Sequence, residues 1–331
     1  MKLPTIAITA GDINGVGYEV IIKTLAHPHI YEVCKPVVYG NKKIMQQHLQ
    51  MLQSEDIHLG NVQVIDCYPD DTPLRLGEST KEAGAASFAA LERACQDIKN
   101  GLADALVTAP INKENIQSDK FTFTGHTEYL ASVFGGEAVM MMVSDVMRVA
   151  LVCNHTPIAK VPSMITQERI LHKLRVLNTT LQTDFLIRKP RIAVLALNPH
   201  AGDNGLVGEE ERNIIKPAIH QANEENILAF GPFSADGFFG AGEYIHYDVV
   251  LAMYHDEGLI PFKTLDMSGV NFTAGMPVVR TSPDHGTAYN LAGKNVADPQ
   301  SFAHALFAAI DIMRNRALSK EINQDPLVVE Q

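Results

Sequence analysis

The stretch PTIAITAGDINGVGYEVIIKTL, residues 4–25, decides the fold class. Its first part, Pro4 to Thr9, is short and apolar, as a buried strand is, and it ends at a turn that contains glycine. From Gly17 to Leu25 the apolar residues recur at helical spacing. A buried strand that leads directly into a helix is the repeating unit of parallel α/β proteins, so this stretch predicts an α/β fold.

The rest of the chain continues this alternation and predicts a largely parallel sheet. Further strands are expected at residues 36–39, 62–65, 105–107, 191–197, 249–253 and 277–281. Helices are expected at residues 42–52, 80–99, 166–186, 209–224 and 301–316. The apolar runs 138–143 and 146–153 flank a turn and predict an antiparallel pair, and the polar tail after Leu318 is expected to fray.

The composition is that of a globular enzyme. Of the 331 residues, 46% are hydrophobic and 20% are charged, which excludes a disordered chain. The formal net charge is −11, which disfavours both non-specific nucleic-acid binding and docking on an anionic membrane.

A cytoplasmic location is the expectation from three further features. The most apolar stretch, residues 138–153, is interrupted by Asp145 and Arg148, so no transmembrane helix is expected. The N-terminus lacks the long apolar region of a secretory signal. The four cysteines are widely spaced and form no CxxC pair, which fits a reducing compartment; they are Cys34, Cys67, Cys95 and Cys153.

The loop after the first strand contains Gly11, Gly15 and Gly17. Three glycines at the start of a helix allow backbone N–H groups to approach an anion. Their spacing differs from the Rossmann pattern, and a tight turn between strand and helix explains them equally well.

Three histidines each follow an apolar run that is expected to be a strand: His155, His200 and His255. Ligands of open α/β sheets bind beyond the carboxyl ends of strands. Three imidazoles with further positions open describe a catalytic site for Zn²⁺ or a similar ion. A lone histidine at a strand end is more often a hydrogen-bonded surface residue, so the residues alone leave both interpretations open.

Other polar residues suggest an anionic substrate. The stretch FTGHTE at residues 123–128 places His126 and Thr127 at an expected helix start, where Thr127 either caps the helix or contributes to a phosphate or carboxylate site. Lys263, Asn271 and Arg280 offer charged or polar partners for an anion, although single basic residues are commonly solvated.

A dense loop near the C-terminus carries a family pattern. The residues HGTA at 285–288, AGK at 292–294 and ADP at 297–299 resemble the HGSAPDIAGK…ANP cofactor loop of isocitrate and isopropylmalate dehydrogenases. Those enzymes bind NAD(P) without a Rossmann fold. This chain has Thr287 for serine and Tyr289-Asn290 for the Pro-Asp pair.

Over residues 4–316 the chain is similar to the 4-hydroxythreonine-4-phosphate dehydrogenases of vitamin B6 synthesis. The motifs that carry the similarity are ITAGDINGVGYE (8–19), TAPINK (108–113), FTGHTE (123–128), NHTP (154–157), LNPHAGDNG (197–205), MYHDEGL (253–259) and GVNFTAGMPVVRTSPDHGTA (269–288). The chain departs from the common family pattern at Ile13-Asn14 and within residues 109–112.

The resemblance implies an isocitrate/isopropylmalate dehydrogenase-like fold of two α/β domains with the active-site cleft between them. Residues 1–122 with 277–331 would form the domain that carries the cofactor loop, and residues 123–276 the domain with most metal and substrate residues and the dimer contacts. The protein would be a homodimer in which both subunits contribute to each active site.

The resemblance also assigns roles to residues. The metal ligands would be His155, His200 and His255, and the substrate-binding residues His126, Thr127, Lys263, Asn271 and Arg280. The cofactor-binding residues would be His285, Gly286, Thr287, Ala288, Gly293 and Asp298, and Asp236 would be an acidic residue near the site.

The implied reaction is oxidation and decarboxylation of 4-hydroxythreonine 4-phosphate to 3-amino-2-oxopropyl phosphate, with NAD or NADP and one divalent ion (Zn, Co or Mg). A Lewis acid would lower the pKa of the substrate hydroxyl and stabilise the enolate left after loss of CO₂. Asp236 and Asp256 are both candidates for the general base. Lys263 would protonate the enolate carbon or anchor the phosphate.

Three alternatives remain at this level. Relatives that oxidise phosphorylated threonate or erythronate would have the same metal site. A zinc hydrolase with three histidines would need no dinucleotide loop. A non-catalytic binding protein would have no reason to keep metal, cofactor and anion residues together.

Overall fold

The structure is a computed structural model, and it describes residues 3–52 and 62–324. The chain divides into two compact units: unit 1 is Met1–Gly136 with Met276–Met313, and unit 2 is Glu137–Gly275 with Arg314–Gln331. The boundaries expected from the sequence were at residues 122/123 and 276/277. In the structure residues 123–136 belong to unit 1, so His126 and Thr127 are found there.

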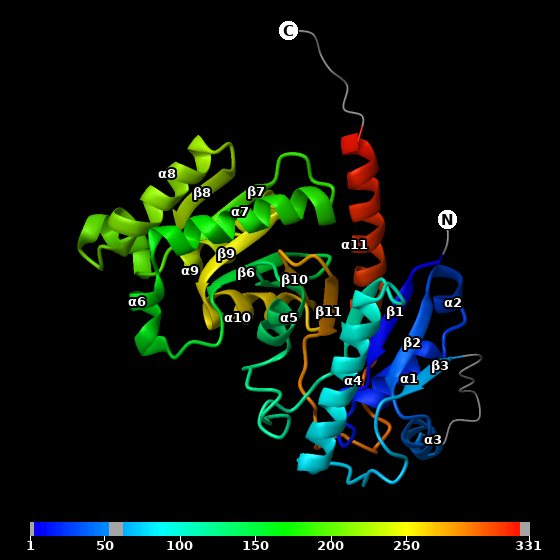
Figure 1. The fold of residues 1–331 in the computed structure, drawn as a ribbon. Helices are drawn as coiled ribbons and strands as arrows, with labels where there is room; N and C mark the ends of the chain where they lie inside the picture. The colour runs from blue at the N-terminus through cyan, green and yellow to red at the C-terminus, as the bar shows by residue number, and fades with distance from the viewer. Residues whose placement is uncertain (1–2, 53–61, 325–331) are drawn as a thin grey trace. The chain divides into compact units, whose positions relative to one another are not determined.

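Unit 1 contains a five-stranded parallel sheet (Figure 1). Its strands, in spatial order, are β3 (Gln63–Asp66), β2 (Lys35–Gly40), β1 (Thr5–Thr9), β4 (Ala105–Thr108) and β11 (Val279–Pro283). Its helices include α1 (Gly17–Leu25), α2 (Ile30–Val33), α3 (Lys42–Met51), α4 (Lys81–Lys99) and α5 (His126–Phe134). Helix α4 packs on β1, β2 and β4.

Local sequence explains where these helices begin. The Asn41 side chain accepts a hydrogen bond from Ile44 N at 3.1 Å, and Thr80 Oγ1 accepts one from Ala83 N at 3.2 Å. Such N-caps satisfy donors that the first helical turn leaves unpaired. The expected strand 4–9 and helix 17–25 are confirmed almost residue for residue.

Unit 2 contains a mixed sheet. Its strands, in spatial order, are β10 (Val270–Ala274), β5 (Val139–Val143), β6 (Arg148–Cys153), β9 (Val249–Tyr254), β7 (Arg191–Leu195) and β8 (Leu228–Phe233). Strands β5 and β6 are antiparallel, which confirms the expected pair, and β6, β9, β7 and β8 run parallel.

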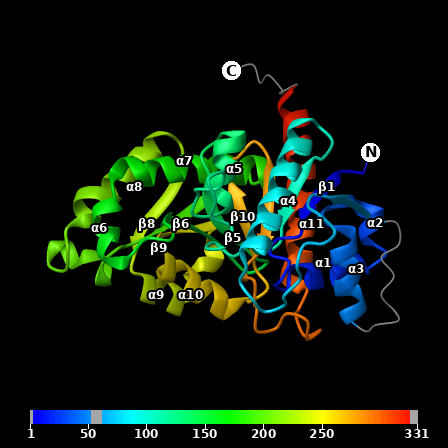
Figure 2. The same ribbon diagram turned by 60° about the horizontal axis from the view of Figure 1, so that its bottom comes forward.

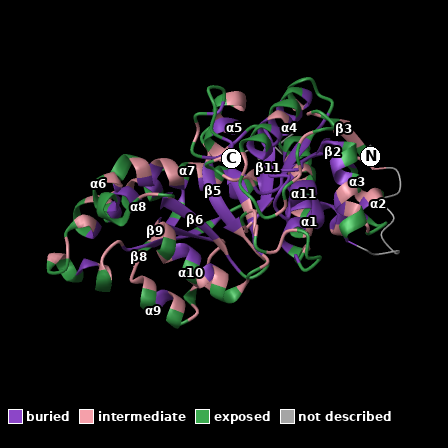
Figure 3. Ribbon diagram, turned by 90° about the horizontal axis from the view of Figure 1, so that it is seen from below, coloured by how far each residue is buried: buried purple, intermediate pink, exposed green. Residues whose placement is uncertain are grey.

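Helices cover both faces of the unit 2 sheet (Figure 2). On one face lie α6 (Val161–Met164), α7 (Gln167–Asp184) and α8 (Lys216–Glu224), and on the other lie α9 (Ala235–Gly240) and α10 (His255–Leu265). The inner strands, such as β4, β6 and β9, are buried (Figure 3), whereas the edge strands β3 and β8 are mostly exposed or partly exposed. In the described part of the chain, no helix combines the length and apolarity of a transmembrane span.

The structure corrects several expected elements. The helix expected at 209–224 begins instead with a π-helical turn, Glu211–Ile215, before α8. Helix α11 runs over Gln300–Gln324, so fraying directly after Leu318 is wrong, and residues 325–331 lie outside the described chain. Strands β8 and β10 and helix α9 were not expected from the sequence.

Candidate functional site

The three candidate metal ligands follow three neighbouring strands of unit 2. His155 comes after β6, His255 after β9 and His200 after β7, and β9 lies between β6 and β7. Since these strands are parallel, their carboxyl ends lie at one edge of the sheet, where ligands of open α/β sheets bind. The sheet order thus places three histidines that are far apart in the sequence at the same edge of the sheet.

His155 and His255 form the closest pair. Their ring centroids lie 5.6 Å apart, with the planes tilted by 40°. Two imidazoles that bind one Zn²⁺ at about 2.1 Å and near-tetrahedral angles have ring centres about 5 Å apart. Nδ1 of His255 lies 2.7 Å from Oδ1 of Asp256, an arrangement that orients an imidazole and leaves its Nε2 for a ligand. These residues fit a divalent ion.

His200 lies in an unusual loop. Its backbone and that of the next four residues are left-handed, with φ between 40° and 76° over His200–Asn204. Each non-glycine residue in this conformation costs about 1–2 kcal/mol, and such strain concentrates at functional sites. Among residues 3–52 and 62–324, no three His, Cys, Asp or Glu side chains already lie close enough together to hold an ion.

Three acidic residues lie near these histidines. Asp236 interacts with His200, and Asp256 and Glu257 directly follow His255 in the chain. The Ser234 hydroxyl donates to Oδ1 of Asp236 at 2.7 Å, and this bond, with the Gly237 N–H and the His200 charge, lowers the pKa of Asp236. Burial raises the pKa of Glu257 to about 8, although backbone N–H groups at its carboxylate act in the opposite direction. Asp236 is therefore ionised at neutral pH.

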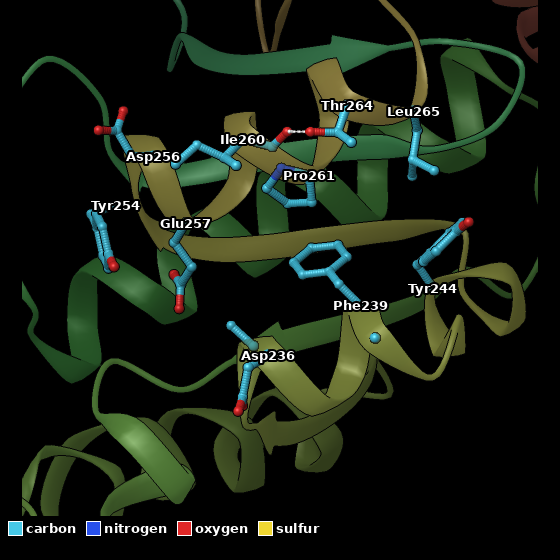
Figure 4. Close-up of a pocket in the computed structure, with 12 residues that line it drawn as sticks. Asp236, Phe239, Tyr244, Tyr254, Asp256, Glu257, Ile260, Pro261, Thr264 and Leu265 are labelled. Carbon is cyan, nitrogen blue, oxygen red and sulfur yellow. Dashed lines mark hydrogen bonds between the residues drawn. The ribbon is translucent and has the colours of Figure 1, made fainter.

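A pocket of about 520 Å³ lies between α9 and α10 (Figure 4). Asp236, Asp256 and Glu257 lie toward one side of it, and Phe239, Tyr244 and Leu265 toward the other (Figure 4). The pocket brings together both candidates for the general base.

Two further candidate residues of unit 2 lie on α10 and β10. Lys263 lies eight positions after His255 on α10, about 12 Å along the helix axis. Asn271 lies on β10, and its Oδ1 is buried without a hydrogen-bond partner among the residues that the structure describes. A buried amide oxygen of this kind fits a group that awaits a ligand.

In unit 1 a cluster of nitrogen groups surrounds His126. Burial holds the pKa of His126 well below its usual range, and the charges of Arg280 and Lys113 lower it further. Its Nε2 is buried without a partner in the described chain. Arg280 is 3% exposed, and its guanidinium donates to Thr108 Oγ1 from Nε at 3.2 Å and from an Nη at 2.7 Å. Burial lowers the pKa of Arg280 to about 10, so it remains charged.

This cluster places His126 near Arg280, both of them candidate substrate-binding residues, and adds Lys113, which lies in the TAPINK motif but had no assigned role. Thr127 is not a helix cap. Helix α5 begins at His126 with Gly125 as the N-cap and no capping side chain, so Thr127 lies in the first turn. Its hydroxyl is therefore free of the capping role that the sequence allowed.

The expected cofactor segment packs against the first loop. Val16 N donates to Thr287 O at 3.0 Å, and the Tyr289 hydroxyl donates to Asp12 Oδ2 at 2.7 Å. Asn115 Nδ2 donates to the same carboxylate oxygen at 2.7 Å. The side chains of Asp12 and Asn115 were not identified from the sequence, because their partners lie in distant segments.

The glycines of the first loop serve this packing. A Cβ at Gly15 would lie 2.6 Å from Thr287 O, one at Gly17 would lie 2.3 Å from Ala10 O, and one at Gly11 would lie 2.3 Å from Pro110 O. The tight-turn interpretation is therefore confirmed for these glycines. The N–H groups of Asp12, Gly15 and Val16 already donate to backbone carbonyls.

The other residues expected to bind the cofactor do not all have the same environment. His285 Nε2 is buried with no partner in the described chain, and a Cβ at Gly286 would meet no atom within 4 Å. Ala288 and Gly293 have positive φ angles of 45° and 75°. Asp298 Oδ1 accepts a hydrogen bond from Gln300 N at 2.9 Å, so this side chain caps the start of α11.

A family model described as "Pyridoxal phosphate biosynthetic protein PdxA" matches residues 32–309. The chain belongs to this family. Its PdxA relatives include the 4-hydroxythreonine-4-phosphate dehydrogenase of Bacteroides thetaiotaomicron, which is 47% identical over 97% of this chain and 92% of that relative. The crystal structure of the Klebsiella pneumoniae 4-hydroxythreonine-4-phosphate dehydrogenase is 34% identical and matches with a TM-score of 0.81 over 94% of this chain and 98% of that one.

Two further similarities bear on the PdxA fold and its substrates. A β-decarboxylating dehydrogenase of Thermococcus kodakarensis matches with a TM-score of 0.50 at 14% identity over 99% of this chain and 100% of that one, which confirms the expected fold group. An Oceanobacillus iheyensis protein named "Putative D-threonate 4-phosphate dehydrogenase" is 39% identical over 94% of this chain and 98% of that relative. The Bacteroides, Klebsiella and Oceanobacillus proteins, each more than 30% identical to this chain, all have dehydrogenase names, which favours a dehydrogenase over a hydrolase.

Proposed function

We propose that this chain oxidises and decarboxylates 4-hydroxythreonine 4-phosphate to 3-amino-2-oxopropyl phosphate, using NAD or NADP and a divalent ion, for pyridoxal 5′-phosphate synthesis. The observation that carries the proposal is the His155–His255 pair with its Asp256 partner. It supports a metal site in a chain whose relatives are named dehydrogenases of this substrate.

His155, His200 and His255 would hold the ion. When bound, it would supply Lewis-acid chemistry that polarises the substrate's hydroxyl and the ketone that replaces it. Zn²⁺ and Co²⁺ suit imidazole ligands, whereas Mg²⁺ prefers oxygen, so the donor set favours the first two. In the homodimer that the resemblance implies, both copies contribute to each active site, so three ligands of one ion need not come from one chain.

The nitrogen cluster of unit 1 would bind the anionic groups of the substrate. Arg280 and Lys113 supply positive charge, and Arg280 matches the planar geometry of a carboxylate or phosphate. Neutral His126 would supply a hydrogen bond through its unpartnered Nε2. Thr127 and Asn271 would complete the polar contacts to the substrate.

The segment from His285 to Asp298 would bind the nicotinamide cofactor. The buried Nε2 of His285 and the open space at Gly286 support this role, and Thr287, Ala288 and Gly293 shape the same backbone. Asp298, which caps α11, would act through the position of that helix. Turnover measured separately with NAD and with NADP decides which of the two cofactors the chain uses.

When bound, the nicotinamide cofactor would accept a hydride from the substrate carbon, and a base of the chain would accept the proton of the hydroxyl. Asp256 and Asp236 are the candidates. The low pKa of Asp236 makes it a weak base, whereas Asp256 lies beside His255. After loss of CO₂ the enol carbon takes up a proton, for which Lys263 is the candidate; the alternative is that Lys263 anchors the phosphate.

A homodimer is supported by exposed apolar side chains on and next to α9 and α10. Ile245, Ile260, Leu265 and Met267 are 68%, 64%, 42% and 75% exposed, and they lie on or next to these helices. Exposed apolar side chains that gather in this way mark interfaces. We propose that a second copy of the chain covers these side chains and that the protein is located in the cytoplasm.

The D-threonate 4-phosphate dehydrogenase similarity supports a second candidate. D-Threonate 4-phosphate has a hydroxyl where the first substrate has an amino group. The oxidised carbon and both anionic groups are the same, so every residue above would keep its role.

The test is NADH formation with 4-phosphooxy-L-threonine, D-threonate 4-phosphate and D-erythronate 4-phosphate, measured separately with NAD and each divalent ion. Turnover that is at least about tenfold more efficient with the amino substrate supports the proposal. Preference for the sugar-acid phosphates would replace it with the second candidate. Absence of NADH with all three would contradict dehydrogenase function of the site.

A further inference from the structure

Glu211 holds the loop that carries His200. This side chain is 2% exposed and stands at the first residue of the π-helical turn Glu211–Ile215. Its Oε1 accepts hydrogen bonds from Leu197 N at 2.9 Å and from Asn198 N at 2.7 Å, and its Oε2 accepts one from Asn198 Nδ2 at 3.0 Å. All three donors lie directly before the left-handed segment.

The same carboxylate also contacts the loop after His200. A Cβ at Gly202 would lie 2.5 Å from Glu211 Oε2, so the Gly202 backbone packs directly against this oxygen. Glu211 therefore contacts the chain on both sides of His200. Because four non-glycine residues here have unfavourable left-handed backbones, the loop needs contacts of this kind to persist.

The neighbouring histidine loop is built in the same way. Glu257 Oε2 accepts a hydrogen bond from Met253 N at 2.6 Å, and its carboxylate also receives the N–H of Tyr254, at the point where β9 leads into His255. In each loop a glutamate receives two consecutive backbone N–H groups just before the histidine. For Glu211 they lie three and two positions before His200, and for Glu257 two and one positions before His255. The arrangement occurs at two adjacent parallel strands, β7 and β9.

We infer that Glu211 is a positioning residue that fixes the direction of the His200 imidazole. This inference rests on the proposed function, because it assigns His200 to a metal ion. Glu211 itself would not contact the ion or the substrate. Supporting residues behind a ligand typically contribute about 10–100-fold to metal affinity.

The first measurement uses the metal-free protein, so it does not depend on the metal assignment. His200 is labelled with diethyl pyrocarbonate, and peptide mass spectrometry gives its rate relative to exposed His220. The variants are Glu211→Ala, which removes all three acceptor contacts, and Glu211→Gln, which removes the charge and keeps the size. The matched control is Glu210→Gln, because Glu210 Oε2 accepts a hydrogen bond from the Asn198 side chain, at 2.8 Å, and the described part of the chain shows no bond from a backbone N–H of this loop to Glu210.

The second measurement is Co²⁺ affinity by competition with a chelator, monitored through the Co²⁺ absorption bands. Both Glu211 variants are expected to change the relative labelling rate of His200. Glu211→Ala is expected to weaken Co²⁺ binding by about 10–100-fold and Glu210→Gln by less than about threefold. If Glu211→Ala does not fold, as judged by its unfolding midpoint, Glu211→Gln decides the outcome.

Unchanged His200 labelling and unchanged Co²⁺ affinity in the folded variants would overturn the inference. His200→Ala separates this result from failure of the proposed function. If His200→Ala weakens Co²⁺ binding and the Glu211 variants do not, only the positioning role is wrong. If His200→Ala binds Co²⁺ as the wild type does, the metal assignment of His200 is wrong, and the labelling rate alone then decides whether Glu211 positions this loop.

Discussion

The imidazoles of His155 and His255 lie with their ring centroids 5.6 Å apart, at the ends of two paired parallel strands. Neither local sequence nor helical spacing relates these two residues. The pairing of β6 with β9 brings them together, and Asp256 orients one of the two rings. The metal site proposed for this chain depends on that relationship, and it leads to the following predictions.

Asp256→Asn is expected to weaken Zn²⁺ or Co²⁺ binding by about 10–100-fold, because the charged acceptor that orients His255 is lost. Asp236→Asn, the matched control in the same pocket, is expected to leave metal affinity within about threefold of wild type. Chelator competition measures both. Equal affinities for all three proteins would mean that Asp256 does not orient a metal ligand.

Arg280→Lys is expected to raise KM for the substrate by about 10–100-fold and to leave KM for NAD nearly unchanged. A lysine cannot reproduce the planar fork that binds a carboxylate or phosphate. Arg93→Lys is the control, since the Arg93 side chain is 47% exposed. Initial-rate kinetics at varied substrate decides; an unchanged substrate KM would exclude Arg280 from the anion site.

Tyr289→Phe is expected to raise KM for NAD by about tenfold, because it removes a hydrogen bond to the buried Asp12 carboxylate that holds the cofactor segment. Tyr31→Phe is the control, as the Tyr31 hydroxyl donates to Leu25 O, outside this segment. The two Michaelis constants are measured separately. A rise in the substrate KM alone would contradict the cofactor assignment.

Acid should destabilise unit 1 through His48. Burial lowers the pKa of His48 to about 4, while Nε2 lies 2.9 Å from Ile13 O. Between about pH 6.5 and pH 4 the unfolded chain binds a proton at this residue and the folded chain does not, so the free energy of unfolding falls as pH falls. The loss amounts to roughly 3 kcal/mol over this range.

His48→Gln is expected to remove this part of the pH dependence, and His29→Gln, at a side chain that is 84% exposed, is expected to retain it. Denaturant unfolding at the two ends of the range measures the difference. Identical pH dependence in wild type and His48→Gln would show that His48 is not held neutral by the fold.

The elements predicted best are those whose signals are local. The strand and helix of residues 4–25 follow from apolar spacing, and the helix at residues 80–99 follows from its alanine-rich apolar stripe. Strand β10, which carries Asn271, was missed because its pairing with β5 comes from a segment more than a hundred residues earlier. No local pattern contains that information.

The sequence predicted which residues belong to the candidate site better than it predicted how they are arranged. The family motifs identified His155, His200, His255, His126 and Arg280. They did not identify Glu211, whose partners lie in another loop, nor the left-handed backbone at His200, which non-glycine residues adopt only when distant contacts impose it. The sequence left the first loop open between an anion site and a tight turn, because its glycines meet backbone from distant segments.

The most direct test of the account is the number of Zn²⁺ or Co²⁺ ions bound per chain by wild type, His155→Ala and His255→Ala, measured by equilibrium dialysis with His29→Ala as the control. The account predicts about one ion per chain in wild type and in the control, and a large loss in both His155→Ala and His255→Ala. Full binding by both of these variants would contradict the metal centre, and with it the proposed mechanism.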